Sequence, residues 1–247
     1  MGKYVLIALM FLVLTGCAGV SETEDKVKPL TVEEHFQIAF DAAQRGNLEE
    51  AVTEYEEVLK MDPKHVRAHL NLGIVFGRQG KFNQEISEYK KALSIDPRLA
   101  EAYYNMGVAY AEAGDVKGAV THYQAALKIN PTYLEALNNL GTIYFRQKRV
   151  DEAFAEYQKT IEINPKYARG YYNLGNVHRE RGNGEEAIRS LKQALEINPK
   201  YAEAHYNLAV IYYEKKDFPL AIQHCDLAGK QGIVVDPGFL ELLKPHR

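Results

Sequence analysis

The amino-acid sequence predicts an all-α fold, a solenoid of six stacked helix pairs closed by a short carboxyl-terminal helix. Three observations predict this fold. Prolines recur every 34 residues, each after an Asp or Asn, at Pro63, Pro97, Pro131, Pro165 and Pro199. Between them, apolar residues recur with helical spacing on both sides of a short turn. Small residues also recur in register, at points where two helix backbones must approach closely.

The boundaries of the units follow from helix start and stop signals. Thr31-Val32-Glu33-Glu34 has the T-x-x-E form of a capping box, which satisfies free amide donors at a helix start. The residue before a proline is driven out of the helical region, so each Asp-Pro or Asn-Pro ends a helix. The repeat region therefore covers residues 31–229. Counting positions from residue 32 divides it into units 32–65, 66–99, 100–133, 134–167, 168–201 and 202–229.

The third unit is the clearest copy of the repeat. Its first predicted helix carries an apolar stripe formed by Tyr103, Met106, Gly107 and Tyr110. After Gly114-Asp115, the second carries a stripe formed by Val116, Ala119, Val120, Tyr123, Ala126 and Leu127. Gly107 and Ala119 are small where the backbones approach, and tyrosines fill the space around them. Each unit is thus predicted to be two amphipathic helices joined by a tight turn.

This pattern resembles the tetratricopeptide repeat (TPR), with its Leu-Gly pair, tyrosine, alanine and proline. The pair recurs as Leu72-Gly73, Met106-Gly107, Leu140-Gly141, Leu174-Gly175 and Leu208-Ala209. The alanine recurs as Ala51, Ala119, Ala153, Ala187 and Ala221. The resemblance implies a right-handed superhelix with a concave groove. Residues 230–247 are predicted to form a capping segment, in which Asp236 caps a helix that begins at Pro237.

Three residues depart from the pattern. Glu85 stands where the second unit should have its small alanine, which is expected either to loosen that helix pair or to indicate a local partner. Lys148 and Lys216 replace the turn glycine. A lysine held at positive φ costs on the order of 1 kcal/mol.

The amino terminus resembles that of a bacterial lipoprotein. The apolar run from Tyr4 to Leu14 would span roughly 16 Å as a helix, too short to cross a bilayer. Leu14-Thr15-Gly16-Cys17 resembles a lipobox, which implies removal of residues 1–16 as a signal peptide and acylation of Cys17. Residues 17–30 would then be a lipidated, flexible tether, and Ala18 implies an outer-membrane protein that faces the periplasm. The alternative is an ordinary secretory signal with a chance cysteine.

Composition and motifs argue against several classes of function. A formal charge of −3, without a basic stripe, argues against a general nucleic-acid binder. No nucleotide-binding, hydrolase or metalloprotease motif occurs, so we expect neither enzymatic activity nor a cofactor. His65 and His69 have the spacing of helix-borne zinc ligands, but position 4, where His69 lies, holds tyrosine in other units. His69 and His205 are therefore expected to fill an aromatic slot, and Cys225, which also replaces a tyrosine, is expected to be buried.

Position 6 is asparagine in five successive units. These residues are Asn71, Asn105, Asn139, Asn173 and Asn207. Position 6 lies about 200° around the helix from position 4, so it is expected to face away from the packing stripe and toward the groove. An amide can both donate to and accept from the peptide group of an extended chain. The arrangement is similar to the asparagine ladder with which members of the family grip peptide backbone; the alternative is that these amides bond locally or are solvated.

Position 5 adds tyrosines at Tyr104, Tyr172 and Tyr206. They offer rigid contact area and a hydroxyl to a bound peptide, or else pack along the first helices. Position 2 lacks the lysine and arginine set with which chaperone-binding members clamp a terminal carboxylate. An acidic carboxyl-terminal tail is therefore not the predicted ligand.

The sequence predicts a membrane-anchored scaffold that binds an extended segment of another protein. By analogy with similar lipoproteins, it would support assembly of a cell-envelope complex, such as a type IV pilus, a secretion system or the outer-membrane assembly machinery. Two alternatives remain open. The array could be a self-associating structural scaffold and form homo-oligomers, or it could be an accessory regulator of a periplasmic cell-wall or polysaccharide enzyme.

Overall fold

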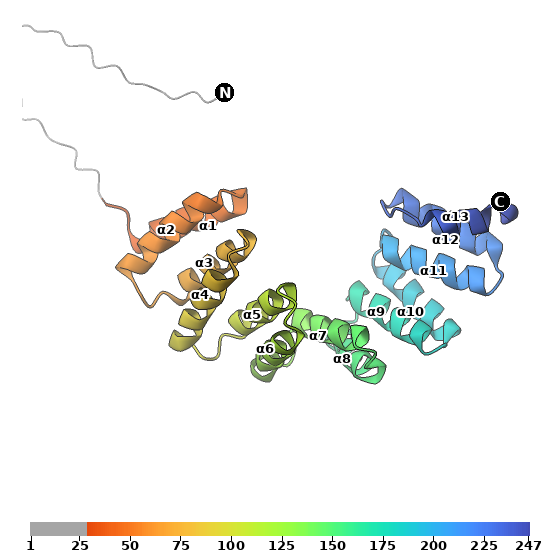
Figure 1. Ribbon diagram of the computed structural model, residues 1–247, viewed down its shortest axis with the longest axis horizontal. Coiled ribbons are helices and arrows are strands. Elements are labelled where there is room, and N and C mark those ends of the chain that lie inside the picture. Colours follow the sequence, from red (N-terminus) through yellow and green to blue (C-terminus); the bar gives the residue numbers. More distant parts are fainter. Residues whose placement is uncertain (1–28) are drawn as a thin grey trace, which may run out of the picture. The chain divides into compact units, whose positions relative to one another are not determined.

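The computed structural model describes residues 29–247, of which Val32–Arg247 form one compact unit of stacked helices (Figure 1). The signal peptide, Cys17 and most of the predicted tether lie outside the described residues. The helices are α1 (Val32–Arg45), α2 (Leu48–Met61), α3 (Val66–Arg78), α4 (Phe82–Ile95), α5 (Ala100–Glu112), α6 (Val116–Ile129), α7 (Leu134–Arg146), α8 (Val150–Ile163), α9 (Ala168–Glu180), α10 (Gly184–Ile197), α11 (Ala202–Glu214), α12 (Phe218–Lys230), α13 (Pro237–Leu243) and the 3₁₀ turn η1 (Lys244–His246).

The helices pair in chain order, α1 with α2 through α11 with α12, and each pair packs on the next. The predicted all-α solenoid is therefore confirmed. Within this unit the pairs follow an arc, with the first helix of each pair on its inner side (Figure 1). None of the helices among residues 29–247 has the length and apolar character needed to cross a membrane.

The Asp-Pro and Asn-Pro dipeptides end the second helix of the first five pairs, and a local hydrogen bond accompanies the turn. Asn130 leaves the helical region at φ −124° and ψ 91°, and its Oδ1 accepts from the backbone N–H of Thr132 at 3.1 Å. The same bond recurs from Asp62 to Lys64 at 3.1 Å and from Asn198 to Lys200 at 3.1 Å. The side chain thus stabilises the turn that proline begins, which explains why both residues recur every 34 positions.

The turn inside each pair needs one residue in the left-handed region. Gly114 supplies it in the third unit with φ 79°. In the fourth and sixth units Lys148 and Lys216 take the same conformation with φ 62°, which confirms the prediction made from the missing glycines. These two turns carry a local strain of about 1 kcal/mol each, which the packing of the pair outweighs.

The helices of a pair approach closely where one is glycine and the other presents a ring. A Cβ added to Gly107 would lie 2.6 Å from ring carbons of Tyr123, and one added to Gly73 would lie 2.5 Å from Tyr89. Both tyrosines are 2% exposed. The recurring glycine and tyrosine positions therefore set how closely the two helices of these pairs approach each other.

The last helix covers the open end of the array. The side chain of Asp236 accepts from the backbone N–H of Phe239 at 2.9 Å and so caps α13 at the residue that the sequence indicated. Phe239 and Leu243 are buried against the core formed around Leu208, and the Phe239 ring meets Tyr206 edge-on at 5.9 Å. The apolar face of α13 therefore closes the core of the sixth unit.

Candidate peptide-binding groove

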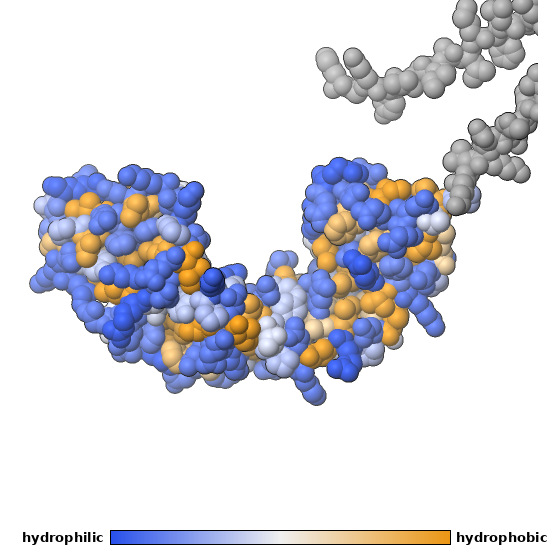
Figure 2. Space-filling model, turned by 180° about the vertical axis from the view of Figure 1, so that it is seen from behind, coloured by the Kyte–Doolittle hydropathy of each residue, from blue (hydrophilic) through white to orange (hydrophobic). Residues whose placement is uncertain are grey.

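The inner side of the array is concave (Figure 2). Three pockets lie along its first helices. We name them after one lining residue each. The Asn105 pocket, between the second and third units, has a volume of about 240 Å³. The Arg169 pocket, between the fourth and fifth units, has about 660 Å³, and the Asn207 pocket beside it has about 570 Å³. The last two share Tyr172 and Asn176, so they form one continuous depression.

The ladder asparagines are less exposed than the helical angle predicts. Asn173 is only 8% exposed and the other four are half-buried, because a second helix packs beside each first helix. Asn71 Nδ2 donates to the Tyr55 hydroxyl at 3.1 Å. Asn139 Nδ2 lies 3.4 Å from the hydroxyls of both Tyr104 and Tyr123. Position 6 therefore lies at the border between core and groove rather than opposite the core.

The asparagines of the fifth and sixth units are held by other amides. Asn173 Nδ2 donates to Asn138 Oδ1 at 2.7 Å, and Asn207 Nδ2 donates to Asn176 Oδ1 at 2.5 Å. Asn138 is fully buried at position 5, where three other units have tyrosine, and its role emerges only when neighbouring units stack. In both bonds the nitrogen is engaged, which leaves the amide oxygens of Asn173 and Asn207 as acceptors at the groove pockets they line.

Asn105 differs from the other four asparagines. Its Nδ2 is buried and has no hydrogen-bond partner within residues 29–247. The equivalent tyrosine, Tyr89, instead donates its hydroxyl to Glu85 Oε1 at 3.2 Å. Burial raises the pKa of the Glu85 carboxyl, and the hydrogen bond from Tyr89 opposes that rise. The unusual glutamate thus has the local partner that its position suggested, and it orients the Tyr89 hydroxyl, which makes no hydrogen bond to Asn105.

Gly77 makes room for the Glu85 carboxyl. A Cβ on Gly77 would lie 2.6 Å from Glu85 Oε1. Neighbouring units have alanine at this position, Ala43 and Ala111. This accommodation was not predicted, although the sequence carries a signal for it, because the alanine-to-glutamate change is matched by an alanine-to-glycine change on the facing helix.

The tyrosines of position 5 are half-buried in aromatic pairs. The ring of Tyr104 lies 4.9 Å from that of Tyr133, and Tyr172 lies 4.9 Å from Tyr201. Tyr172 lines both the Arg169 and the Asn207 pockets, whereas Tyr104 and Tyr206 line none of the three pockets described above. Asn71 and Asn139 line none of them either. The groove pockets therefore bring together Asn105, Tyr172, Asn173 and Asn207 of the predicted set.

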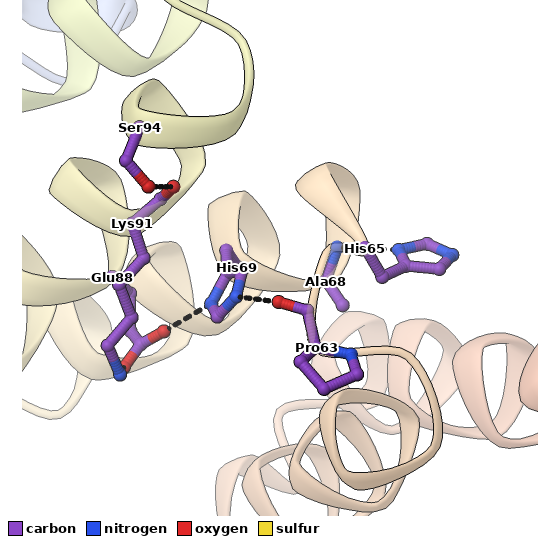
Figure 3. A network of polar contacts seen from close by, with 7 residues as sticks. All are labelled: Pro63, His65, Ala68, His69, Glu88, Lys91 and Ser94. Atoms are coloured by element: carbon purple, nitrogen blue, oxygen red, sulfur yellow. Dashed lines mark hydrogen bonds and ion pairs between the residues drawn. The ribbon is translucent and has the colours of Figure 1, made fainter.

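The histidines of position 4 line none of the three groove pockets and join the two helices of a pair. Figure 3 shows the contacts of one of them, His69. His69 is buried, with Nδ1 2.6 Å from Glu88 Oε2 and Nε2 3.1 Å from the Pro63 carbonyl. His65 points away from it and caps α3 by accepting from the Ala68 N–H at 3.1 Å. No group of three or more potential metal-binding side chains occurs within residues 29–247.

The pairing of position 4 with position 23 was not predicted. His35 repeats the contact with Glu54 at 2.6 Å, and His205 Nδ1 lies 2.9 Å from His224 Nδ1. The signal available in the sequence was the spacing of 19 residues, at which a glutamate follows both His35 and His69. Cys225, next to His224, is buried and free, as its place in the tyrosine column predicted.

These features define a helical-repeat scaffold of the kind that mediates protein–protein interactions. Family models described as "TPR repeat" match residues 43–80, 78–114 and 175–216, and models described as "Tetratricopeptide repeat" match 104–168 and 156–189. The chain belongs to the tetratricopeptide repeat family. The repeats of this family are typically non-catalytic modules for protein interaction.

Solved structures show the same fold. A crystal structure of MamA protein is 32% identical, with 70% of this chain and 94% of that chain covered and a TM-score of 0.59. The pilF protein of Pseudomonas aeruginosa is 26% identical over 72% of this chain and 80% of that chain, with a TM-score of 0.65. YrrB, described as a TPR protein with an unusual peptide-binding site, is 21% identical over 77% and 97%, with a TM-score of 0.61, and shows the fold alone. Comparison with curated proteins gives no match.

Proposed function

We propose that this chain is a membrane-anchored scaffold that holds an extended segment of a partner protein in its inner groove and so supports assembly of a cell-envelope complex. The observation that carries the proposal is the free amide of Asn105, which lines a groove pocket with a nitrogen that nothing holds within residues 29–247. The terminal torsion of an asparagine is broad, so this amide can turn toward a ligand without breaking a hydrogen bond. A peptide carbonyl is the natural acceptor for it.

The other ladder residues support the same mode of binding. The nitrogens of Asn173 and Asn207 are fixed by neighbouring amides, so these side chains are oriented before a ligand arrives. Their oxygens can accept from peptide N–H groups, while the ring of Tyr172 offers apolar area between them. Preorganised groups lower the entropy cost of binding a segment that is itself flexible.

Asn105→Ala is expected to weaken binding of groove ligands by about three- to tenfold, the worth of one neutral hydrogen bond. The measurement uses peptides selected on the immobilised full chain from a displayed library of random peptides, each about 12 residues long so that it can span several units. Because the Asn105 nitrogen has no internal partner within residues 29–247, the thermal midpoint should not fall. Asn71→Ala is the matched control, since it removes the bond to Tyr55 and should lower stability by about 1 kcal/mol.

A second variant tests the geometry. Glu85→Ala restores the small residue of the other units and removes the carboxylate that orients the Tyr89 hydroxyl, so this hydroxyl can turn to accept from Asn105, as Tyr55 accepts from Asn71. This variant should also weaken peptide binding, although it does not alter Asn105. If no peptide is selected, or if selected peptides bind Asn105→Ala as tightly as the unchanged protein, the groove proposal is wrong.

The membrane anchor rests on the resemblance of residues 14–17 to a lipobox and is tested separately. Cys17→Ser is expected to remove the acyl chains and release the protein from the membrane fraction, or to leave it unprocessed with its signal peptide. The measurement is fractionation of cells followed by mass spectrometry of the amino-terminal peptide. Cys225→Ser is the control, because this buried thiol plays no part in anchoring. An acylated, membrane-bound Cys17→Ser protein would contradict the proposal.

A further inference from the structure

The Arg169 pocket contains two guanidinium groups that lack an internal counter-ion. Arg146 comes from the last residue of α7, and Arg169 comes from the first turn of α9. Neither makes a hydrogen bond or an ion pair within residues 29–247. In contrast, Arg78 donates to the Ala43 carbonyl, and Arg179 forms an ion pair with Glu214. The two free charges therefore lie on one pocket and have not been neutralised by the fold.

Both guanidinium groups influence the same buried hydroxyl. Burial raises the pKa of Tyr157, whereas its hydrogen bond to Thr142 and the charges of Arg169 and Arg146 oppose that rise. Tyr157 lines the pocket and donates to Thr142 Oγ1 at 3.2 Å. Two cations that line one pocket together with hydrogen-bonded hydroxyl and amide groups make a site that suits a carboxylate, because charge-assisted hydrogen bonds to arginine are stronger than neutral ones.

Glu203 is the one acidic residue among those that line this pocket, and it is exposed and also without an ion pair within residues 29–247. The formal charge at the pocket therefore stays positive, with two arginines against one glutamate. The residues of position 2 alone did not indicate a basic site. The second arginine of the pocket, Arg146, lies at position 13 of the preceding unit, so it belongs to a different column of the repeat. The pairing arises only when adjacent first helices stack.

We propose that the Arg169 pocket selects an acidic side chain within the bound segment, an Asp or Glu that places its carboxylate between Arg146 and Arg169. This inference rests on the proposed function, since it presumes a peptide in the groove. It assigns the pocket to an internal side chain rather than to a free carboxyl terminus, because the depression continues past it into the Asn207 pocket. A segment that passes through both pockets does not end at the arginines.

The pockets also set a spacing for the partner. Adjacent packed helices lie about 8–10 Å apart, so the Asn105 and Arg169 pockets, two units apart, are separated by roughly 16–20 Å. An extended chain covers about 3.3 Å per residue, so some five or six residues would connect them. The acidic side chain is therefore expected five or six residues from the backbone group that Asn105 holds.

The test uses the same displayed library, in which every peptide is fused at its carboxyl end and so has no free terminal carboxylate. Peptides selected on the full chain should be enriched in Asp or Glu at one position. A synthetic, carboxyl-amidated copy of an enriched peptide should bind at least about tenfold more tightly than its Asp→Asn or Glu→Gln twin. In the double variant Arg146→Gln/Arg169→Gln this difference should disappear.

Two further variants complete the test, one as a control and one with an expected gain in binding. Arg189→Gln removes one positive charge from α10, where Arg189 pairs with Glu186, and should leave the preference unchanged. Glu203→Gln removes the competing negative charge from the pocket and should strengthen binding of the acidic peptide. Far-UV circular dichroism establishes that the double variant is folded, which we expect because neither arginine has a partner within residues 29–247.

The outcomes separate this inference from the proposed function. The inference is wrong if the selected peptides depend on Asn105 but are not enriched in Asp or Glu. It is also wrong if the preference for the acidic peptide persists in the double variant. Neither outcome contradicts the proposed peptide-binding function. Binding that occurs only with a free carboxyl terminus overturns the assignment to a side chain. Failure to select any peptide overturns the proposed function itself.

Discussion

Gly107→Ala is expected to lower the free energy of unfolding by about 2 kcal/mol. The added Cβ would lie 2.6 Å from Cδ1 and Cε1 of Tyr123, closer than two carbon atoms can pack. Tyr123 cannot easily move aside, because it is 2% exposed and its ring lies against that of Tyr104 at 5.8 Å. Overpacking of this kind typically costs about 1–3 kcal/mol and outweighs the better helix propensity of alanine. Urea unfolding followed by circular dichroism provides the measurement.

A glycine-to-alanine substitution at a site with free space around it should raise stability instead of lowering it. Gly184 begins α10 with no atom within 4 Å of an added Cβ and with no positive φ. Gly184→Ala should therefore raise stability by about 0.5–1 kcal/mol, chiefly by restricting the unfolded chain. Hydrogen exchange should localise the loss in Gly107→Ala to α5 and α6, since each unit contacts mainly its neighbours. An unchanged unfolding midpoint for Gly107→Ala would contradict the interlocking of glycine and tyrosine columns.

The parts of the fold predicted most completely from sequence are those that depend on local backbone chemistry. Asn130-Pro131 ends a helix through bonds within the next two residues, and Lys216 must adopt positive φ because the turn allows nothing else. Such features repeat at fixed intervals and need no knowledge of neighbouring units. This explains why the ends of the second helices at Asp-Pro and Asn-Pro, and the capping role of Asp236, could be predicted from the chain alone.

The candidate site was predicted less well because it depends on contacts between units. The angle of position 6 on a single helix placed Asn173 on the open face, but a neighbouring asparagine, Asn138, holds it almost buried. Likewise, Asn105 lacks the tyrosine bond that Asn71 makes, and the equivalent tyrosine, Tyr89 on α4, donates to Glu85 instead. A helical wheel describes one helix, whereas the groove is formed by three or more.

The unit with two facing histidines should lose stability on acidification. His205 Nε2 faces the Pro199 carbonyl at 3.2 Å, so it carries the proton, and Nδ1 of His205 then accepts from Nδ1 of His224. Protonation of His224 would place a positive charge on a half-buried ring close to Lys192. Burial, then the charges of His205 and of Lys192 on α10, lower the pKa of His224 to about 4, against an ordinary value of 6.5.

The direction of the pH effect follows from proton binding. Between about pH 6.5 and pH 4 the unfolded chain binds the His224 proton and the folded chain does not, so stability falls as the pH falls through this range. The shift corresponds to about 2 kcal/mol after allowance for partial exposure of the ring. The expected result is a lower thermal midpoint at about pH 5 than at about pH 7, with hydrogen exchange rising first in α11 and α12.

His224→Glu is the matched variant, because it would create a histidine–glutamate pair that the chain already contains in two other units. His35 faces Glu54 and His69 faces Glu88 at 2.6 Å in the same two repeat positions. The variant lacks the His224 ring, whose protonation the folded chain disfavours, and a carboxylate faces His205 instead, so acidification from about pH 7 to about pH 5 should no longer destabilise α11 and α12. His122 and His178, whose pKa values burial also lowers, are present in both proteins, so their contributions cancel in the comparison. If the variant loses stability over this range as much as the unchanged protein does, the His205–His224 contact is not the source of the acid sensitivity.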